Sequence, residues 1–354
     1  MRPITATIDL RALTHNLAVA QRCASGSKVF AVIKANAYGH GVLRAARAFA
    51  GAHGFAVIEL EAAVRLREAG YRQRILLLEG FFEPRELAVL VDYKLSTTVH
   101  SPEQLDMLSA LPAHSALDVL LKVNTGMNRL GLQPADAPGA LERLERHPGV
   151  GQISVMTHFA NADAPIGIAD QVEIFDAAVG KDRPRSLANS AAVLRFPESH
   201  GDWVRPGIML YGCSPFPESI ASDLDLRAAM TLASEIIAVR DLAPGEAVGY
   251  GSLFVAHEPT RVAVVACGYA DGYPRHAPTG TPVLVGDRLT RTLGRVSMDM
   301  LCVDLTAITD ARVGTRVVLW GEGNPVEHVA EAAGTVGYEL LCALAPRVRV
   351  LEKP

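Results

Sequence analysis

The sequence predicts an α/β fold: a (β/α)8 TIM-like barrel followed by a mainly antiparallel β domain. Three observations predict it. From about residue 29 to 212, short apolar β-like segments alternate with amphipathic helical segments. After about residue 225 the segments are short, rich in Val and Thr, and separated by Gly, Pro and Asp. The 354 residues also exceed the ~250 of a typical barrel, which leaves enough chain for a second domain.

Eight β-like segments lie in the first region. The helical segments between them carry apolar residues three or four positions apart, with charged residues in between. Eight such units favour a closed parallel barrel, and an open doubly wound sheet is the alternative. The β-like segments are residues 29–34, 55–59, 75–78, 96–99, 118–123, 152–159, 185–188 and 203–210.

The change near residue 225, from alternating β-like and helical segments to short Val- and Thr-rich segments, sets the expected domain boundary. We place the barrel at residues 1–225 and the β domain at residues 226–354, with residues 215–227 as the connection. The extreme N-terminal strand is a candidate for pairing with the β domain. Late in the second region a helical pattern (VEHVAEAAG) precedes a terminal strand (RVRVLEKP).

Composition excludes several classes of protein. The net charge is −4, from 34 basic and 38 acidic residues, and no basic block suggests a nucleic-acid or anionic-membrane partner. No apolar run approaches the ~18 residues of a membrane span, and the N-terminus becomes polar too early for a signal peptide. The five scattered cysteines form no Cys-x-x-Cys pair, and no His/Cys spacing indicates a metal site. We therefore expect a cytoplasmic protein without metal.

Two of the six lysines end apolar β-like segments, where a barrel positions its active site. Lys34 follows VFAVI and precedes ANAYGHG. Burial would lower the pKa of its amine, which could then form a Schiff base, whereas the alternative is a lysine at a strand's exit to solvent. Lys122 ends LDVLL. Arg129 follows in a glycine-containing loop, where it could hold a carboxylate or phenolate oxygen, or the two could form a surface pair around a turn.

Further candidates follow the later segments. His158 ends the sixth segment, where a core histidine bonded to the backbone is the commoner case. Ser190 begins a short helical run and could bind phosphate there, or cap the helix. Arg205, Gly207 and Ile208 in the eighth segment could add a charge and nearby N–H groups, or simply break the strand.

Six tyrosines adjoin glycine, which allows the tight turns that place a side chain at a cleft. For each tyrosine alone an ordinary turn is the simpler interpretation. A phenol has a pKa near 10, so nearby cations are needed before it can carry a proton at neutral pH. These residues are Tyr38, Tyr211, Tyr250, Tyr269, Tyr273 and Tyr338.

The candidate residues lie in motifs that follow one another along the chain: AVIKANAYGHG, KVNTGMNRLGL, MTHFANAD, LANSAA, VRPGIMLYG, VGYG, ACGYADGYPR, GRVSMDM and GYELLC. Together these motifs resemble, in order and over nearly the whole chain, the alanine racemase family. The resemblance implies pyridoxal 5'-phosphate as cofactor, a homodimer with shared active sites, and racemisation of L- and D-alanine. It leaves open whether the enzyme supplies D-alanine, as for a bacterial cell wall, or consumes it.

The resemblance also implies roles. Lys34 would hold the cofactor covalently and act as one base, with Tyr250 from the other subunit as the second. Lys122 matches a position that is often carbamylated in the family, where the added carboxylate anchors Arg129. His158 would lie beside the ring and bond to Arg205. The residues implied to bind cofactor are Lys34, Tyr38, Arg129, His158, Ser190, Arg205, Gly207, Ile208 and Tyr338, and those implied to contact substrate are Arg129, Met298, Asp299 and Tyr269.

Two alternatives share the fold or part of it. A broad-specificity amino-acid racemase has the same architecture but is usually exported. A non-enzymatic pyridoxal-phosphate carrier resembles the barrel alone, so Tyr250, Met298 and Tyr338 in the second region argue against it. In one departure from the family pattern, Ser297 stands where some members have a cysteine.

Overall fold

The computed structural model describes residues 2–354, which form two compact units. One, the barrel unit, comprises residues 16–37 and 41–210. The other, the β unit, comprises the residues up to His15, residues 38–40 and the residues from Tyr211 onwards. No helix within residues 2–354 is long and apolar enough to cross a bilayer.

The barrel unit contains eight strands, one in each expected β-like segment. Every strand pair is parallel, and the order β8-β7-β6-β5-β4-β3-β2-β9 returns the last strand to the first. This confirms the barrel and rules out the open doubly wound sheet. The strands are β2 (Lys28–Val32), β3 (Gly54–Val57), β4 (Arg74–Leu77), β5 (Ser96–Val99), β6 (Leu117–Lys122), β7 (Val150–Met156), β8 (Arg185–Ser186) and β9 (Trp203–Val204).

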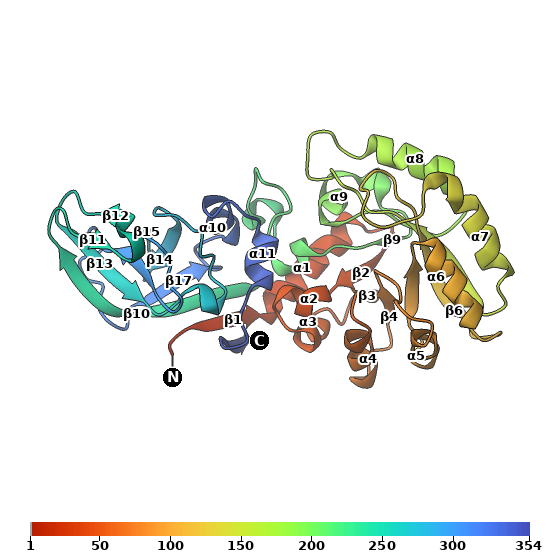
Figure 1. The fold of residues 1–354 in the computed structure, drawn as a ribbon, viewed down its shortest axis with the longest axis horizontal. Coiled ribbons are helices and arrows are strands. Elements are labelled where there is room, and N and C mark those ends of the chain that lie inside the picture. Colours follow the sequence, from red (N-terminus) through yellow and green to blue (C-terminus); the bar gives the residue numbers. More distant parts are fainter. Residues whose placement is uncertain (1) are drawn as a thin grey trace. The chain divides into compact units, whose positions relative to one another are not determined.

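Helices connect these strands and lie outside them (Figure 1). In α7 the buried residues Ala137, Ala140, Leu141 and Leu144 form the stripe expected of an amphipathic helix packed on a sheet. The α6 helix begins with Pro102, and Ser101 accepts a capping hydrogen bond from Gln104 N. The helices are α1 (Leu10–Cys23), α3 (Val42–Ala48), α4 (Leu60–Glu68), α5 (Glu86–Asp92), α6 (Pro102–Met107), α7 (Ala137–Arg146), α8 (Ala169–Val179) and α9 (Ser190–Arg195).

The strands β8 and β9 are shorter than expected, with two residues each. No ladder joins them; instead Ser186 Oγ donates to Trp203 O at 2.7 Å, and Asp202 N donates to Arg185 O at 3.0 Å. Pro206 lacks an N–H group and so cannot extend a ladder. On the other side of β9, the ring of Trp203 stacks on Phe30 of β2 with centroids 4.0 Å apart.

The β unit is built on one eight-stranded sheet, confirming the mainly antiparallel domain. Its order is β13-β16-β15-β14-β17-β10-β1-β18, and β13 also pairs with β10, so six strands close on themselves. A small hairpin of β11 (Ala247–Val248) and β12 (Phe254–Val255) and two helices, α10 (Val326–Ala332) and α11 (Gly337–Cys342), complete it. The sheet strands are β1 (Thr5–Asp9), β10 (Met230–Leu242), β13 (Thr260–Val265), β14 (Pro282–Val285), β15 (Arg288–Leu293), β16 (Leu301–Asp304), β17 (Arg316–Trp320) and β18 (Arg349–Lys353).

The grouping of residues in the two units differs from the expected boundary at 225/226. Strand β1 pairs antiparallel with β10 and parallel with β18, so the N-terminal strand groups with the β unit. Residues 211–225 group there as well. Ala229 N donates to Tyr211 O at 3.2 Å, and a Cβ added to Gly212 would lie 1.7 Å from Arg227 O. These tight backbone contacts hold the start of residues 211–225 against the segment that leads into β10.

Gly212 provides a test of this packing. It has a φ of +71° and no room for a methyl group, so we expect Gly212→Ala to lower the free energy of unfolding by at least ~2 kcal/mol. Gly286 has a similar φ of +62° with nothing within 4 Å, so Gly286→Ala should cost only about 1 kcal/mol. Urea unfolding followed by circular dichroism measures both; equal losses would contradict the packing argument.

Candidate active site

The carboxyl ends of the barrel strands gather the basic candidates. Lys122 is the last residue of β6, Lys34 and His158 lie two residues beyond β2 and β7, and Arg205 follows β9. Because all eight strands are parallel, their carboxyl ends meet at one face of the barrel. Burial and then the charges of Arg205, Lys122, Arg129 and Lys34 lower the pKa of His158, so these cations lie near it.

Arg205 is the most firmly fixed of these side chains. It is 4% exposed, and its guanidinium donates to Ser186 O at 2.7 Å, Ser186 Oγ at 2.6 Å, Thr157 O at 2.6 Å and Leu187 O at 3.3 Å. Burial lowers its pKa to about 10, so it remains charged at neutral pH. Within residues 2–354 no carboxylate forms an ion pair with it. These bonds use Nη1 and Nη2, and within residues 2–354 Nε makes no hydrogen bond.

The site as a whole carries excess positive charge. Burial, followed by the charges of Arg205 and Arg129, lowers the pKa of the buried Lys122 to about 8. Burial and the same cations hold the pKa of His158 well below its usual value. Glu79 is the carboxylate that opposes this effect at Lys122. A buried group of cations with so little negative charge favours an anionic ligand.

Lys34 enters an unusual backbone turn. The four residues after it, labelled within α2 (Lys34–Tyr38), have φ values of +50° to +55°, which is one turn of left-handed helix. Such a turn costs about 1–2 kcal/mol per residue with L-amino acids. Hydrogen bonds from Gly41 N to Asn36 O (2.8 Å) and from Val42 N to Asn36 Oδ1 (3.3 Å) help to hold it. Strained backbone of this kind is concentrated at functional sites.

A second arrangement lies at the start of α9. Asn189 caps this helix by accepting from Ala192 N at 3.0 Å, so Ser190 does not serve as the cap. Instead Ser190 Oγ accepts from Gly207 N at 2.8 Å and Met209 N at 3.4 Å. Because both contacts use the oxygen as acceptor, the hydroxyl hydrogen can be donated to an anion.

Two candidate tyrosines come together in the β unit. The buried ring of Tyr38 stacks on Tyr211 with centroids 4.6 Å apart and lies 6.1 Å from the ring of Tyr338 on α11. Burial raises the pKa of Tyr38 well above its usual value, so this phenol stays protonated. It can donate a hydrogen bond.

The other β-unit candidates are exposed. Tyr250, in the 3-10 turn η6 (Tyr250–Ser252), is 71% exposed, and Met298 is 52% exposed. Tyr269 begins the turn η7 (Tyr269–Asp271), and its N–H donates to Ser297 O at 3.1 Å, which places it beside Met298 and Asp299.

The candidates therefore form two sets. The barrel unit holds Lys34, Lys122, Arg129, His158, Ser190, Arg205, Gly207 and Ile208, and the β unit holds Tyr38, Tyr250, Tyr269, Met298, Asp299 and Tyr338. Sequence analysis missed Glu79, although it follows the apolar segment 75–78 as Lys34 follows its own. It also missed Arg2, Asp271 and Arg347, which surround Asp299 and which no local pattern marks.

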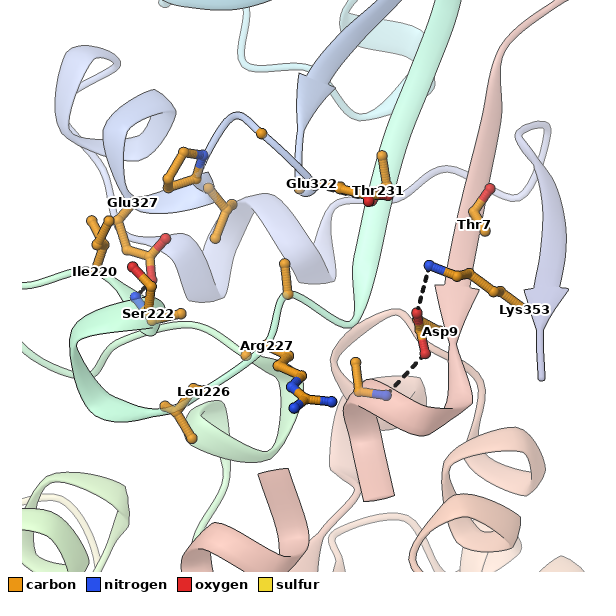
Figure 2. Close-up of a pocket in the computed structure, with 18 of the residues that line it drawn as sticks. Thr7, Asp9, Ile220, Ser222, Leu226, Arg227, Thr231, Glu322, Glu327 and Lys353 are labelled. Carbon is orange, nitrogen blue, oxygen red and sulfur yellow. Dashed lines mark hydrogen bonds and ion pairs between the residues drawn. The ribbon is translucent and has the colours of Figure 1, made fainter. Parts of the chain in front are cut away.

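A separate pocket of about 650 Å³ lies in the β unit, and its lining includes none of the candidate residues (Figure 2). Two of its carboxylates are already bonded. Asp9 pairs with Lys353 at 3.0 Å and accepts from Ala12 N, and Glu327 accepts from Ser214 N and Ala221 N at 2.7 and 3.0 Å. We do not place the chemistry there. Within residues 2–354 no group of three His, Cys, Asp or Glu residues is arranged to hold a metal.

Comparison with known proteins gives a consistent result over the full chain. Two family models match: "Alanine racemase, N-terminal domain" over residues 8–215 and "Alanine racemase, C-terminal domain" over residues 229–351. An alanine racemase of Nitrosospira multiformis is 62% identical over 98% of this chain and 99% of its own. One from a Janthinobacterium species is 54% identical over 99% of both chains. The crystal structure of the biosynthetic alanine racemase of Pseudomonas aeruginosa superposes with a TM-score of 0.97, at 48% identity and 100% coverage of both chains.

The lowered pKa of Lys122 predicts a pH-dependent stability in the cofactor-free, carbon-dioxide-free chain. Below pH 8 the folded state keeps a charged amine in an unfavourable site. The lowering of the Lys122 pKa from 10.5 to about 8 corresponds to a loss of roughly 3 kcal/mol in the free energy of unfolding. Lys122→Met should therefore stabilise the chain at pH 7 by roughly 1–3 kcal/mol, and the gain should shrink as the pH rises from 8 towards 10.5.

Urea unfolding between pH 7 and pH 10 measures this effect. The matched control is Lys181→Met, because Lys181 is an exposed lysine paired with Asp176, and its removal should change stability by less than about 1 kcal/mol. A gain for Lys122→Met that does not vary with pH would contradict the assignment.

Proposed function

This chain belongs to the alanine racemase family, and we propose from that premise that it interconverts L-alanine and D-alanine with pyridoxal 5'-phosphate as cofactor. The observation that carries the proposal is the group of cations around Lys34 at the carboxyl face of the barrel. A lysine is the residue that binds this cofactor covalently, and the surrounding positive charge matches the cofactor's phosphate and phenolate groups.

The residues present fit that cofactor. In the barrel unit, the Ser190 hydroxyl and the backbone at Gly207 and Ile208 are proposed to bind the phosphate. In the β unit, Tyr38 and Tyr338 are the residues that the family resemblance implies for it. A Ser190 Oγ with a hydrogen to donate and a protonated Tyr38 support this assignment. When bound, pyridoxal phosphate supplies an electron sink that acidifies the Cα proton of an attached amino acid.

Lys34 has two proposed tasks. Its Nζ would hold the cofactor covalently. The same amine would accept or return the Cα proton on one face of the substrate. The left-handed turn that follows Lys34 supports this role, because it fixes the backbone next to the reacting amine.

Arg205 is proposed to face the pyridine nitrogen, with His158 beside the ring and close to Arg205. Since the pKa of Arg205 is about 10, the guanidinium keeps its protons at neutral pH and offers a hydrogen bond where a carboxylic acid would offer a proton. This leaves the ring a weaker electron sink. We infer that it limits side reactions such as transamination.

Arg129 is proposed to contact the phenolic oxygen of the cofactor and the substrate carboxylate. Carbamylation of Lys122 would give Arg129 a carboxylate partner. A Lys122 pKa near 8 supports this, because the reaction with carbon dioxide requires the neutral amine. The Met298 N–H is proposed to bind the substrate carboxylate, with Asp299 beside it and Tyr269 at the entrance.

Tyr250 is the proposed second base, on the opposite face of Cα and in the neighbouring subunit of a homodimer. Two bases are needed because one group cannot easily reach both faces. In the single chain Tyr250 is largely exposed. Leu253, three residues further along, is also exposed, and so are Met298 and Met300 in the same unit. Exposed apolar side chains of this kind support an interface with a second copy.

The alternatives are weaker. A carrier that resembles the barrel alone does not account for the match of the C-terminal domain over residues 229–351. A broad-specificity racemase is distinguished by assaying a panel of amino acids. We propose a cytoplasmic location, where thiols such as Cys213 and Cys267 stay reduced. The supply of D-alanine is the proposed role, in line with the biosynthetic relative from P. aeruginosa.

Removing Lys34 tests the reaction. The purified protein with pyridoxal phosphate should interconvert L- and D-alanine, and Lys34→Ala should lower kcat at least about 1,000-fold because both the attachment point and one base are lost. Chiral chromatography of the products measures the rate. Racemisation at the wild-type rate by Lys34→Ala would contradict the assignment.

Removing the Tyr250 hydroxyl tests the second base. Tyr250→Phe should slow exchange of the Cα proton with solvent deuterium about 100-fold or more for one enantiomer of alanine, and much less for the other. Mass spectrometry of each enantiomer after incubation in deuterated buffer measures both rates. Equal losses for the two enantiomers would count against two separate bases.

A further inference from the structure

A buried carboxylate, Asp271, ends the turn η7 that begins with Tyr269 and packs against the turn that carries Met298. Asp271 has no exposed side-chain surface. Its carboxylate accepts from Arg347 Nε at 2.6 Å, from Arg2 Nη2 at 2.9 Å and from Gly268 N at 3.0 Å. Bonds from charged donors to a carboxylate are about twice as strong as neutral ones, so this carboxylate is held firmly.

The same two arginines reach Asp299. Arg347 Nη2 donates to Asp299 Oδ1 at 2.7 Å, and Arg2 Nη2 donates to Asp299 O at 2.9 Å. Each guanidinium therefore links Asp271 to Asp299. Two cations and two anions balance, in contrast to the excess positive charge in the barrel unit. We call these four residues the Asp271 network.

Backbone contacts also join the turn that contains Asp271 to the turn that contains Asp299. Tyr269 N donates to Ser297 O at 3.1 Å, and Ala270 N donates to Met298 O at 3.0 Å. A Cβ added to Gly268 would lie 2.3 Å from Ser297 O and 2.4 Å from Met298 O, so the two turns are in direct contact. The 297–300 turn is closed by Ser297 N donating to Met300 O at 2.9 Å.

The 297–300 turn leaves backbone donors unused. Within residues 2–354 the N–H groups of Met298, Asp299 and Met300 make no hydrogen bond, and Met298 is half exposed. The carbonyl of Met298, by contrast, is held by Ala270 N. A rigid turn with successive N–H groups that have no partner within the chain is suited to receiving an anion.

We propose that Arg2 and Arg347 are positioning residues that act through Asp271 and Asp299 to hold the Met298 N–H where it receives the substrate carboxylate. The inference rests on the proposed function, because Met298 is the proposed carboxylate ligand. Neither arginine touches the substrate. A donor held in place by other residues affects binding of the ground state and the transition state alike, so its loss changes KM more than kcat.

The test is a comparison of KM and kcat for alanine in the cofactor-loaded dimer. Arg347→Ala should raise KM about tenfold and change kcat by less than about threefold. The inhibition constant of propionate, which has the carboxylate but no amine, should rise in parallel. Arg347→Lys should recover part of the loss, because a lysine can still donate to one of the two aspartates but lacks the planar fork that bridges both.

A matched control separates positioning from stability. Arg291 of β15 pairs with Asp304 of β16 at 3.1 Å in the same unit. Arg291→Ala removes an Arg–Asp pair elsewhere in that sheet and should leave KM and propionate binding unchanged. If Arg347→Ala does not fold, Arg2→Ala removes the other half of the network and is judged by the same KM and propionate measurements.

The outcomes are distinct. Normal racemisation by the wild-type protein with an unchanged KM in Arg347→Ala overturns the inference and leaves the proposed function intact. A fall in thermal stability without a change in KM also overturns it, because that is the behaviour of a purely structural ion pair. An inactive wild-type protein would overturn the proposed function itself.

Discussion

Closure of eight parallel strands is the constraint on which the site depends. It brings the carboxyl ends of strands far apart in sequence to one face, and Arg205 is fixed at that face by carbonyl groups at the ends of β7 and β8. Backbone carbonyls satisfy this guanidinium without neutralising it. Burial and then the charge of Arg205 lower the pKa of Lys122 and His158. An anionic cofactor is the chemical counterpart of that arrangement.

The two units contribute different chemistry. The barrel unit provides a lysine and several cations around a small, polar site. The β unit provides phenols and an exposed backbone turn, and its charged groups are balanced, as the ion pairs of Asp271 and Asp299 show. The unbalanced positive charge of the barrel unit favours binding of an anionic ligand. The balanced ion pairs of Asp271 and Asp299 instead hold the backbone turns in place. The proposed two-base reaction requires both, with the exposed Tyr250 taken from a second copy.

Much of the fold follows from local sequence patterns. Each of the eight strands overlaps one of the predicted apolar segments. Lys34 and Lys122 were identified because they lie at the ends of such segments. Features that depend on distant contacts could not be found in this way. Arg2 and Asp271 are 269 positions apart, and residues 211–225 join the β unit through backbone contacts that no composition reveals. The left-handed turn after Lys34 was missed because three of its four residues, Ala35, Ala37 and Tyr38, are of types that rarely adopt positive φ. Assignment of the site residues came mainly from the family resemblance, because spacing alone left an ordinary structural interpretation open for each.

The central claim is that one complete site uses Lys34 of one chain and Tyr250 of another. Mixing Lys34→Ala with a Tyr250→Phe variant, followed by subunit exchange, tests it most directly. In half of the dimers the two different subunits meet, and one of the two sites then contains both natural residues, so we expect about a quarter of the wild-type activity to return. Formation of mixed dimers, verified by native mass spectrometry, without any recovery of activity would contradict the shared site.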